Sequence, residues 1–136
     1  MVVDVRTLTV ANLIIQLLLV MIISGAVYLA KNRETGRHCT VMNIAAPVEI
    51  AAVAAVMFPS MVGYVLHEEP RLVFYLVMGI HHTFGISAIM LWIYINLVFR
   101  GIMTMPSNLR TVMKLALASW MSSLVLGLFL LIQVLS

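Results

Sequence analysis

The chain of 136 residues is short of charge, cysteine and aromatic side chains. Charged residues make up 10% of it and hydrophobic residues 63%, which excludes an ordinary soluble domain. Cys39 is the only cysteine, so no intrachain disulfide and no CxxC or CxxCH motif is possible. The aromatic content of 8% supports no stacking platform, and basic loops beside a membrane need no nucleic acid as a partner. No residue pattern resembles the nucleophile constellation of a hydrolase.

Four apolar runs account for most of the chain, and each is long enough to cross a bilayer. We therefore predict an all-α fold, a single transmembrane domain over residues 1–136 that forms an antiparallel four-helix bundle. A cleaved signal peptide is not expected, because the first run is too long and no basic segment precedes it. The predicted spans are residues 8–30, 40–66, 73–99 and 112–135.

The basic residues are distributed unevenly between the two ends of the predicted spans. Only Arg6 and Arg71 lie at one end. The positive-inside rule places the more basic end, with loops one and three, in the cytoplasm and both chain termini outside. The expected location is the cell membrane, as a multi-pass protein. The basic residues of loops one and three are Lys31, Arg33, Arg37, Arg100, Arg110 and Lys114.

Two adjacent histidines, His81 and His82, interrupt the third apolar run well inside the membrane. Ionisable side chains at this depth usually face the bundle interior, form pairs, or serve protons, metals or haem. His81 shares a helical row with Gly85 and Ala88, and small residues mark buried helix faces. We predict that His81 is an axial ligand or a direct neighbour of a cofactor. His82 points toward a lateral face, which indicates a second subunit or a cofactor at the lipid edge.

Glu49 lies among alanines in the second run, just after Pro47, where a local kink is expected. Hydrocarbon penalises the ionised form of a carboxyl group, so Glu49 is expected to be uncharged at neutral pH. Two roles stay open for it. One is helix packing, and the other is proton transfer from the cytoplasmic side.

Counting residues away from the loops estimates the depth of each polar group. The count predicts an outer layer with His81, Gln16 and Met57, and a deeper layer with Glu49 and Ser123. No histidine of another span falls opposite His81, so Met57 is the one candidate for a second ligand within the chain. A second copy or a foreign subunit would otherwise supply that ligand.

The remaining polar and small residues are interpreted as helix-packing residues. Asn12 and Gln16 give the first run a mildly polar face, which typically serves helix packing. Ser119, Ser123 and Gly127 form a small-residue stripe on the last run that permits close contact with another helix. We interpret this stripe as an assembly surface.

Several residues of the last three spans occur in a characteristic order. They are His38 with Met42, Tyr64 with His67, a histidine at 81 or 82, and Trp120 before Ser123 and Gly127. This order resembles the small four-helix membrane proteins that include the cytochrome-oxidase maturation factor CtaM. The family pattern has a further histidine in the loop before the last helix, where this chain has Asn108 or Leu109. The resemblance implies work connected with haem-containing respiratory complexes.

Two classes of function follow. In the first, the chain is a redox subunit that binds haem b or contacts a membrane quinone-like carrier and passes electrons to a respiratory complex. In the second, it is a non-catalytic subunit or assembly factor of such a complex. In neither is it a complete enzyme. The partners are the lipid bilayer and other membrane subunits or a second copy, and the candidate cofactor or metal ligands are His81, His82, His67, His38 and Met57.

Overall fold

The computed structural model describes residues 5–67 and 72–135, which are helical apart from two connecting turns. No strand occurs in this part of the chain, so the all-α prediction is confirmed for it. One short stretch, η1, is π-helical. The elements are α1 (Val5–Lys31), α2 (Thr35–Ala52), η1 (Val53–Met57), α3 (Phe58–His67), α4 (Leu72–Phe99) and α5 (Leu109–Leu135).

Four helical stretches of the described residues are long and apolar enough to cross a membrane, as the sequence predicts. Of the 18 residues taken as the apolar part of each stretch, no more than 17% are buried. Apolar side chains therefore face outward along most of each helix. This is the composition of a multi-pass membrane protein whose helices contact lipid. The stretches are Arg6–Lys31, Thr35–Leu66, Leu72–Phe99 and Leu109–Val134.

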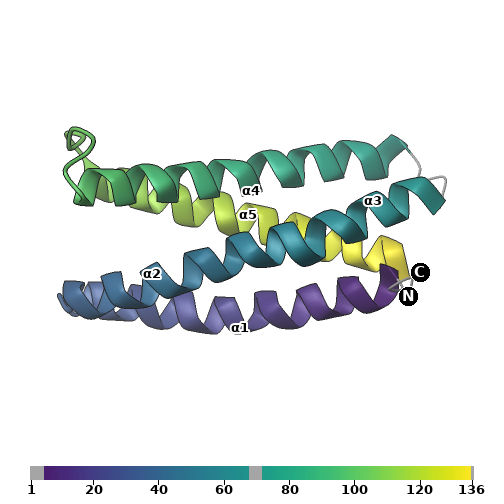
Figure 1. Cartoon of the computed structure of the whole chain (residues 1–136), viewed down its shortest axis with the longest axis horizontal. Helices are drawn as coiled ribbons and strands as arrows, with labels where there is room; N and C mark the ends of the chain where they lie inside the picture. The colour runs from purple at the N-terminus through teal and green to yellow at the C-terminus, as the bar shows by residue number, and fades with distance from the viewer. Residues whose placement is uncertain (1–4, 68–71, 136) are drawn as a thin grey trace. The chain divides into compact units, whose positions relative to one another are not determined.

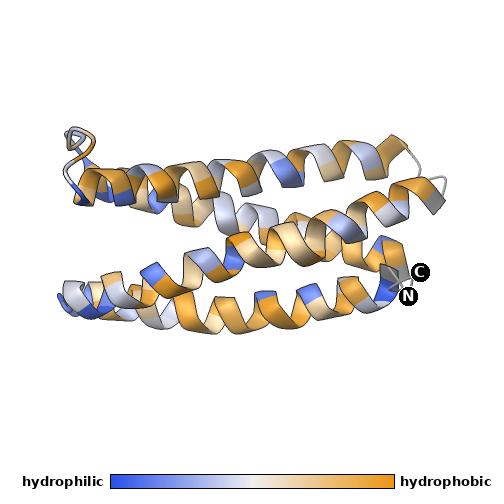
Figure 2. Ribbon diagram, in the orientation of Figure 1, coloured by the Kyte–Doolittle hydropathy of each residue, from blue (hydrophilic) through white to orange (hydrophobic). Residues whose placement is uncertain are grey.

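The chain divides into two helical hairpins at the boundary between residues 69 and 70. In the N-terminal hairpin, α1 packs against α2, η1 and α3, and in the C-terminal hairpin α4 packs against α5 (Figure 1). Hydrophobic residues line most of each helix, whereas hydrophilic residues gather at the turn between α1 and α2 (Figure 2). The prediction of a single domain stays a prediction, and each hairpin is described separately below.

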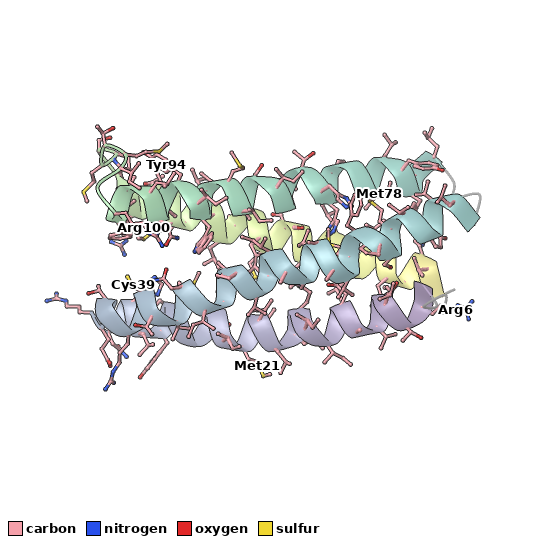
Figure 3. All side chains as sticks on the ribbon, in the orientation of Figure 1. Arg6, Met21, Cys39, Met78, Tyr94 and Arg100 are labelled. Carbon is pink, nitrogen blue, oxygen red and sulfur yellow. The ribbon has the colours of Figure 1, made fainter. Side chains whose placement is uncertain are left out.

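The N-terminal hairpin is closed by one face of α1 whose residues recur at alternating spacings of three and four. The apolar half of this face is buried, with Leu19 2% exposed and Ala26 0% exposed. On α2, Ala45 is 1% exposed. Met21 projects from α1 on the side away from α2 and is 63% exposed (Figure 3). The residues of the packed face are Thr9, Asn12, Gln16, Leu19, Ile23 and Ala26.

The second span contains two prolines and deviates from α-helical geometry near the second. Pro47 lies inside α2, which continues through it to Ala52, and the kink expected there stays a prediction. The backbone instead widens in η1, where the N–H of Phe58 donates to the carbonyl of Val53, five residues earlier. Pro59 follows at once, and because it has no N–H it cannot continue a regular ladder. The π-turn accommodates this second proline.

The C-terminal hairpin has a seam with a seven-residue repeat. Phe74, His81, Ala88 and Ile95 are all buried on α4 and lie seven residues apart. A strict seven-residue repeat keeps one face of a helix against a neighbour through a left-handed supercoil. His81 therefore occupies a packing position of the seam, although it is a polar residue.

Both described turns begin with the same helix-ending motif. After α1, the N–H of Glu34 donates to the carbonyl of Leu29, and Arg33 adopts a φ of 63°. After α4, the N–H of Ile102 donates to the carbonyl of Leu97, and Gly101 adopts a φ of 72°. This is the Schellman arrangement, whose left-handed position favours glycine. Arg33 thus places a positive charge in the turn at a backbone cost of about 1–2 kcal/mol.

The two turn residues predict opposite effects of substitution. Arg33→Gly relieves the left-handed strain and should raise the free energy of unfolding by about 1 kcal/mol, whereas Gly101→Ala introduces that strain and should lower it by about 1 kcal/mol. The measurement is reversible unfolding in mixed detergent micelles. Arg33→Ala removes the charge but keeps the strain, so it should not stabilise the protein. A stabilisation by Arg33→Ala equal to that of Arg33→Gly would assign the effect to charge.

Candidate functional site

His81 is held against α5 by three hydrogen-bond contacts with Ser123. Its Nδ1 lies 2.7 Å from the carbonyl oxygen of Ser123, and because a carbonyl only accepts, Nδ1 carries the proton. The hydroxyl of Ser123 donates to the backbone carbonyl of His81 at 3.1 Å and lies 3.2 Å from Nδ1. His81 and Ser123 are 8% and 7% exposed. These bonds account for a buried polar pair within one hairpin.

Gly127 makes the approach of His81 to α5 possible. In an α-helix the carbonyl of Ser123 points toward residue 127, and a side chain there would cover it. A Cβ atom at Gly127 would lie 3.1 Å from Cε1 of His81 and 3.5 Å from its Nδ1. Ser123 and Gly127, interpreted from the sequence as part of an assembly surface, therefore face α4 of their own hairpin.

The side chain of His82 is bonded within its own helix, whereas that of His81 is bonded to α5. Its Nδ1 lies 2.7 Å from the carbonyl of Met78, one turn earlier on the same helix, so Nδ1 is again the protonated nitrogen. Its Nε2 then carries a lone pair, and this atom is buried without a hydrogen-bond partner among the described residues. The two imidazole rings are 5.0 Å apart and nearly perpendicular. His82 thus presents an oriented imidazole whose Nε2 lone pair takes part in no hydrogen bond within the described residues.

Glu49 is bonded across the N-terminal hairpin to Gln16. Nε2 of Gln16 donates to Oε2 of Glu49 at 2.6 Å, and both side chains are partly buried. The predicted layers, which separated Gln16 from Glu49 and His81 from Ser123, are therefore wrong in both pairings. For Gln16 and Glu49 the cause is the start of α2, which lies at Thr35 and not at residue 40. Counted from Thr35, Glu49 is as far from the turn as Gln16 is.

Two further polar groups continue this seam toward the N-terminal end of α1. The hydroxyls of Thr9 and Ser60 are 2.8 Å apart. Asn12 lies between Thr9 and Gln16 on the same face, and its Oδ1 is buried without a hydrogen-bond partner in the described structure. Sequence reasoning assigned Asn12 to packing. Only the structure shows that its amide oxygen has no hydrogen-bond partner among the described residues.

The other candidate ligands have separate positions. Nδ1 of His38 lies 2.8 Å from the carbonyl of Ala26, where it fastens the start of α2 to the end of α1. Met57 is the last residue of η1 and is half-buried. His67 ends α3, and its side chain lies outside the described residues. Their assignment as cofactor ligands stays a prediction.

A metal centre held by the chain's own ionisable side chains is not evident. No group of three or more histidine, cysteine, aspartate and glutamate residues comes together within the described ranges. His81 and His82 could thus supply one or two ligands, with the remainder coming from a cofactor or another chain. No family model, curated protein or solved structure matches the chain. The resemblance to four-helix respiratory maturation proteins accordingly stays a prediction.

The packing role of His81 predicts that Gly127 is sensitive to substitution. Gly127→Val places methyl groups against the imidazole ring and should lower the free energy of unfolding by about 1–3 kcal/mol, the usual cost of overpacking. Gly79→Val on α4 is the matched control, because a Cβ there meets nothing within 4 Å. Thermal unfolding in detergent measures both. Equal losses in the two variants would contradict a specific contact between Gly127 and His81.

Proposed function

We propose that the chain is a small subunit of a membrane redox complex and that His82 provides its contact with haem b or with a membrane quinone-like carrier. The observation that carries this proposal is the buried, unpartnered Nε2 of His82. Leaving a buried polar atom unsatisfied costs about 1–3 kcal/mol, so such atoms in a native structure usually have a function or a missing partner.

The donor chemistry of His82 fits an axial-ligand role. A histidine that binds a metal commonly donates its other N–H to a carbonyl, which fixes the tautomer and the orientation of the ring. Met78 provides that carbonyl at 2.7 Å. Haem b, when bound, would supply one-electron transfer. His81 shows the same pattern, because its Nδ1 is tied to the carbonyl of Ser123, and it is the alternative ligand.

The proposed setting is an antiparallel four-helix bundle in the cell membrane, with both termini outside and the basic turns in the cytoplasm. The distribution of basic residues supports this orientation. A second axial ligand would come from another membrane subunit or from a second copy. The family resemblance supports a respiratory complex as the partner.

A non-catalytic role as a structural subunit or assembly factor is the second candidate. The contacts of His81 favour it, since its hydrogen bonds and its packing against Gly127 account for an intramembrane histidine without any cofactor. In that case His82 would complete its hydrogen bonding with a group of the partner complex.

The redox proposal predicts a haem spectrum that depends on His82. Protein purified gently from its membrane should show Soret and alpha bands, and His82→Ala should abolish them because it removes the imidazole nitrogen that is buried without a hydrogen-bond partner. Thr83→Ala, a neighbouring substitution at an exposed position on α4, is the matched control and should keep the bands. Bands that survive in His82→Ala would exclude His82 as the ligand and leave His81 to be tested in the same way.

Both candidate roles predict a larger assembly. Native mass spectrometry of gently solubilised membranes should find the chain in a complex with a second copy or with other subunits. Loss of a cofactor on dissociation of that complex would place the site at the subunit interface. A single chain that retains a stoichiometric cofactor would contradict the need for another subunit.

A further inference from the structure

We infer that the end of the C-terminal hairpin at the α4–α5 turn (residues 100–108) binds the headgroup of an anionic phospholipid through Arg100, Arg110 and Lys114. Arg100 directly follows α4, and the other two residues lie at the start of α5. This inference is independent of the proposed redox function, because it concerns the end of the hairpin and not the histidines within the span. It is based on unbalanced charge, on exposed apolar side chains beside that charge, and on a comparison with the turn between α1 and α2.

The positive charge at this end of the C-terminal hairpin has no acidic counterpart within the hairpin. No aspartate or glutamate occurs in residues 70–136. Arg100, Arg110 and Lys114 are exposed, and the described structure contains no salt bridge from any of them. Arg110 and Lys114 lie four residues apart, so their like charges are neighbours on one face of α5 and repel each other. An anion bound beside them lowers this repulsion.

The turn between α1 and α2 differs in its charge balance. It also has three basic residues, Lys31, Arg33 and Arg37, but Glu34 lies among them. Nη1 of Arg37 lies 2.8 Å from Oε2 of Glu34, so an internal carboxylate already engages one of the three positive charges. The positive-inside rule counts basic residues and is little affected by acidic ones, so it does not require a turn without carboxylates. An anion site is favoured by their absence, because a neighbouring carboxylate would compete for the basic side chains.

Apolar side chains of the α4–α5 turn are exposed beside the basic ones. Ile102, Met103 and Met105 are 67%, 45% and 67% exposed. The apolar stretch Leu72–Phe99 ends directly before the turn, which places the turn at the boundary between hydrocarbon and headgroups. Exposed apolar residues combined with lysine and arginine are typical of segments that lie in this interfacial layer. A phospholipid fits both kinds of side chain, because its phosphate and its acyl chains meet at the same boundary.

A hydrogen bond ties the α4–α5 turn back to α4. The hydroxyl of Tyr94, near the end of α4, donates to the carbonyl of Thr104 at 3.5 Å. Figure 3 shows Tyr94 and Arg100 at the same end of the hairpin. The turn is thus held close to the hydrocarbon boundary. Lys114 lies one helical turn further along α5 than Arg110, and its long apolar stem lets the ammonium group reach the level of the phosphates from there.

The test is native mass spectrometry of the purified full-length protein. The detergent micelles contain equal amounts of phosphatidylglycerol, which is anionic, and phosphatidylcholine, which is zwitterionic, with the same acyl chains. The wild type should retain phosphatidylglycerol at least about tenfold more often than phosphatidylcholine. Arg110→Gln combined with Lys114→Gln should lower this preference at least about fivefold, because each basic residue near an anionic lipid surface contributes a factor of about five.

The matched control removes two positive charges from the other turn. Lys31→Gln combined with Arg33→Gln gives the same net charge as the first double variant and should keep the wild-type preference. Circular dichroism should show equal helix content in all three proteins. An equal loss of preference in both double variants would assign it to net charge and overturn the site. A wild type that retains both lipids equally would overturn it as well.

A second measurement distinguishes the lipid headgroup from a free anion. Radiolabelled inorganic phosphate is dialysed to equilibrium against the wild type and against the variant at Arg110 and Lys114. The two proteins should retain equal amounts, because free phosphate lacks the acyl chains that hold a headgroup at the turn. Phosphate that only the wild type retains would assign the site to a free anion and overturn the lipid. The double variant should also keep any haem bands of the wild type, so the redox proposal is tested separately.

Discussion

The absence of water from the hydrocarbon core is the constraint on which the arrangement of this protein depends. A polar group between apolar helices must find its hydrogen-bond partner within the protein, because no water is available there to form hydrogen bonds with it. Each hairpin meets this constraint with a cross-helix pair: Gln16 with Glu49 in one, and His81 with Ser123 in the other. Such pairs contribute only about 1 kcal/mol each in membrane proteins. Their larger effect is on register, since a slipped helix would leave two polar groups unsatisfied where there was one bond.

Small residues make these pairs possible by letting the backbones approach. Gly127 leaves the carbonyl of Ser123 open to the imidazole of His81, and Ala26 of α1 and Ala45 of α2 are 0% and 1% exposed. The packing between helices depends on van der Waals contact, because lipid is as apolar as the helix surfaces and provides no hydrophobic driving force. The helix backbones approach each other most closely at these small residues, so larger side chains are least tolerated there. One of these residues, Gly127, lies directly beside His81.

Among the described residues, two buried side-chain atoms have no hydrogen-bond partner: Nε2 of His82 and Oδ1 of Asn12. The first is a ring nitrogen with a lone pair, and the second is an amide oxygen that accepts hydrogen bonds. The two atoms belong to different hairpins, so each can be tested without disturbing the other.

The sequence by itself determined that the chain is helical and has four apolar spans, because a run of about twenty apolar residues has one stable backbone conformation in a bilayer. It also identified His81, His82 and Glu49 as ionisable residues within apolar spans, where such side chains are rare and costly. Which groups meet was decided only by the tertiary structure. The start of α2 at Thr35 brought Gln16 level with Glu49, and the depth count missed this because helix ends depend on a turn such as the one at Arg33. The unpartnered Nε2 of His82 was likewise beyond the sequence, because the burial and hydrogen bonding of a ring nitrogen depend on the neighbours that the fold supplies.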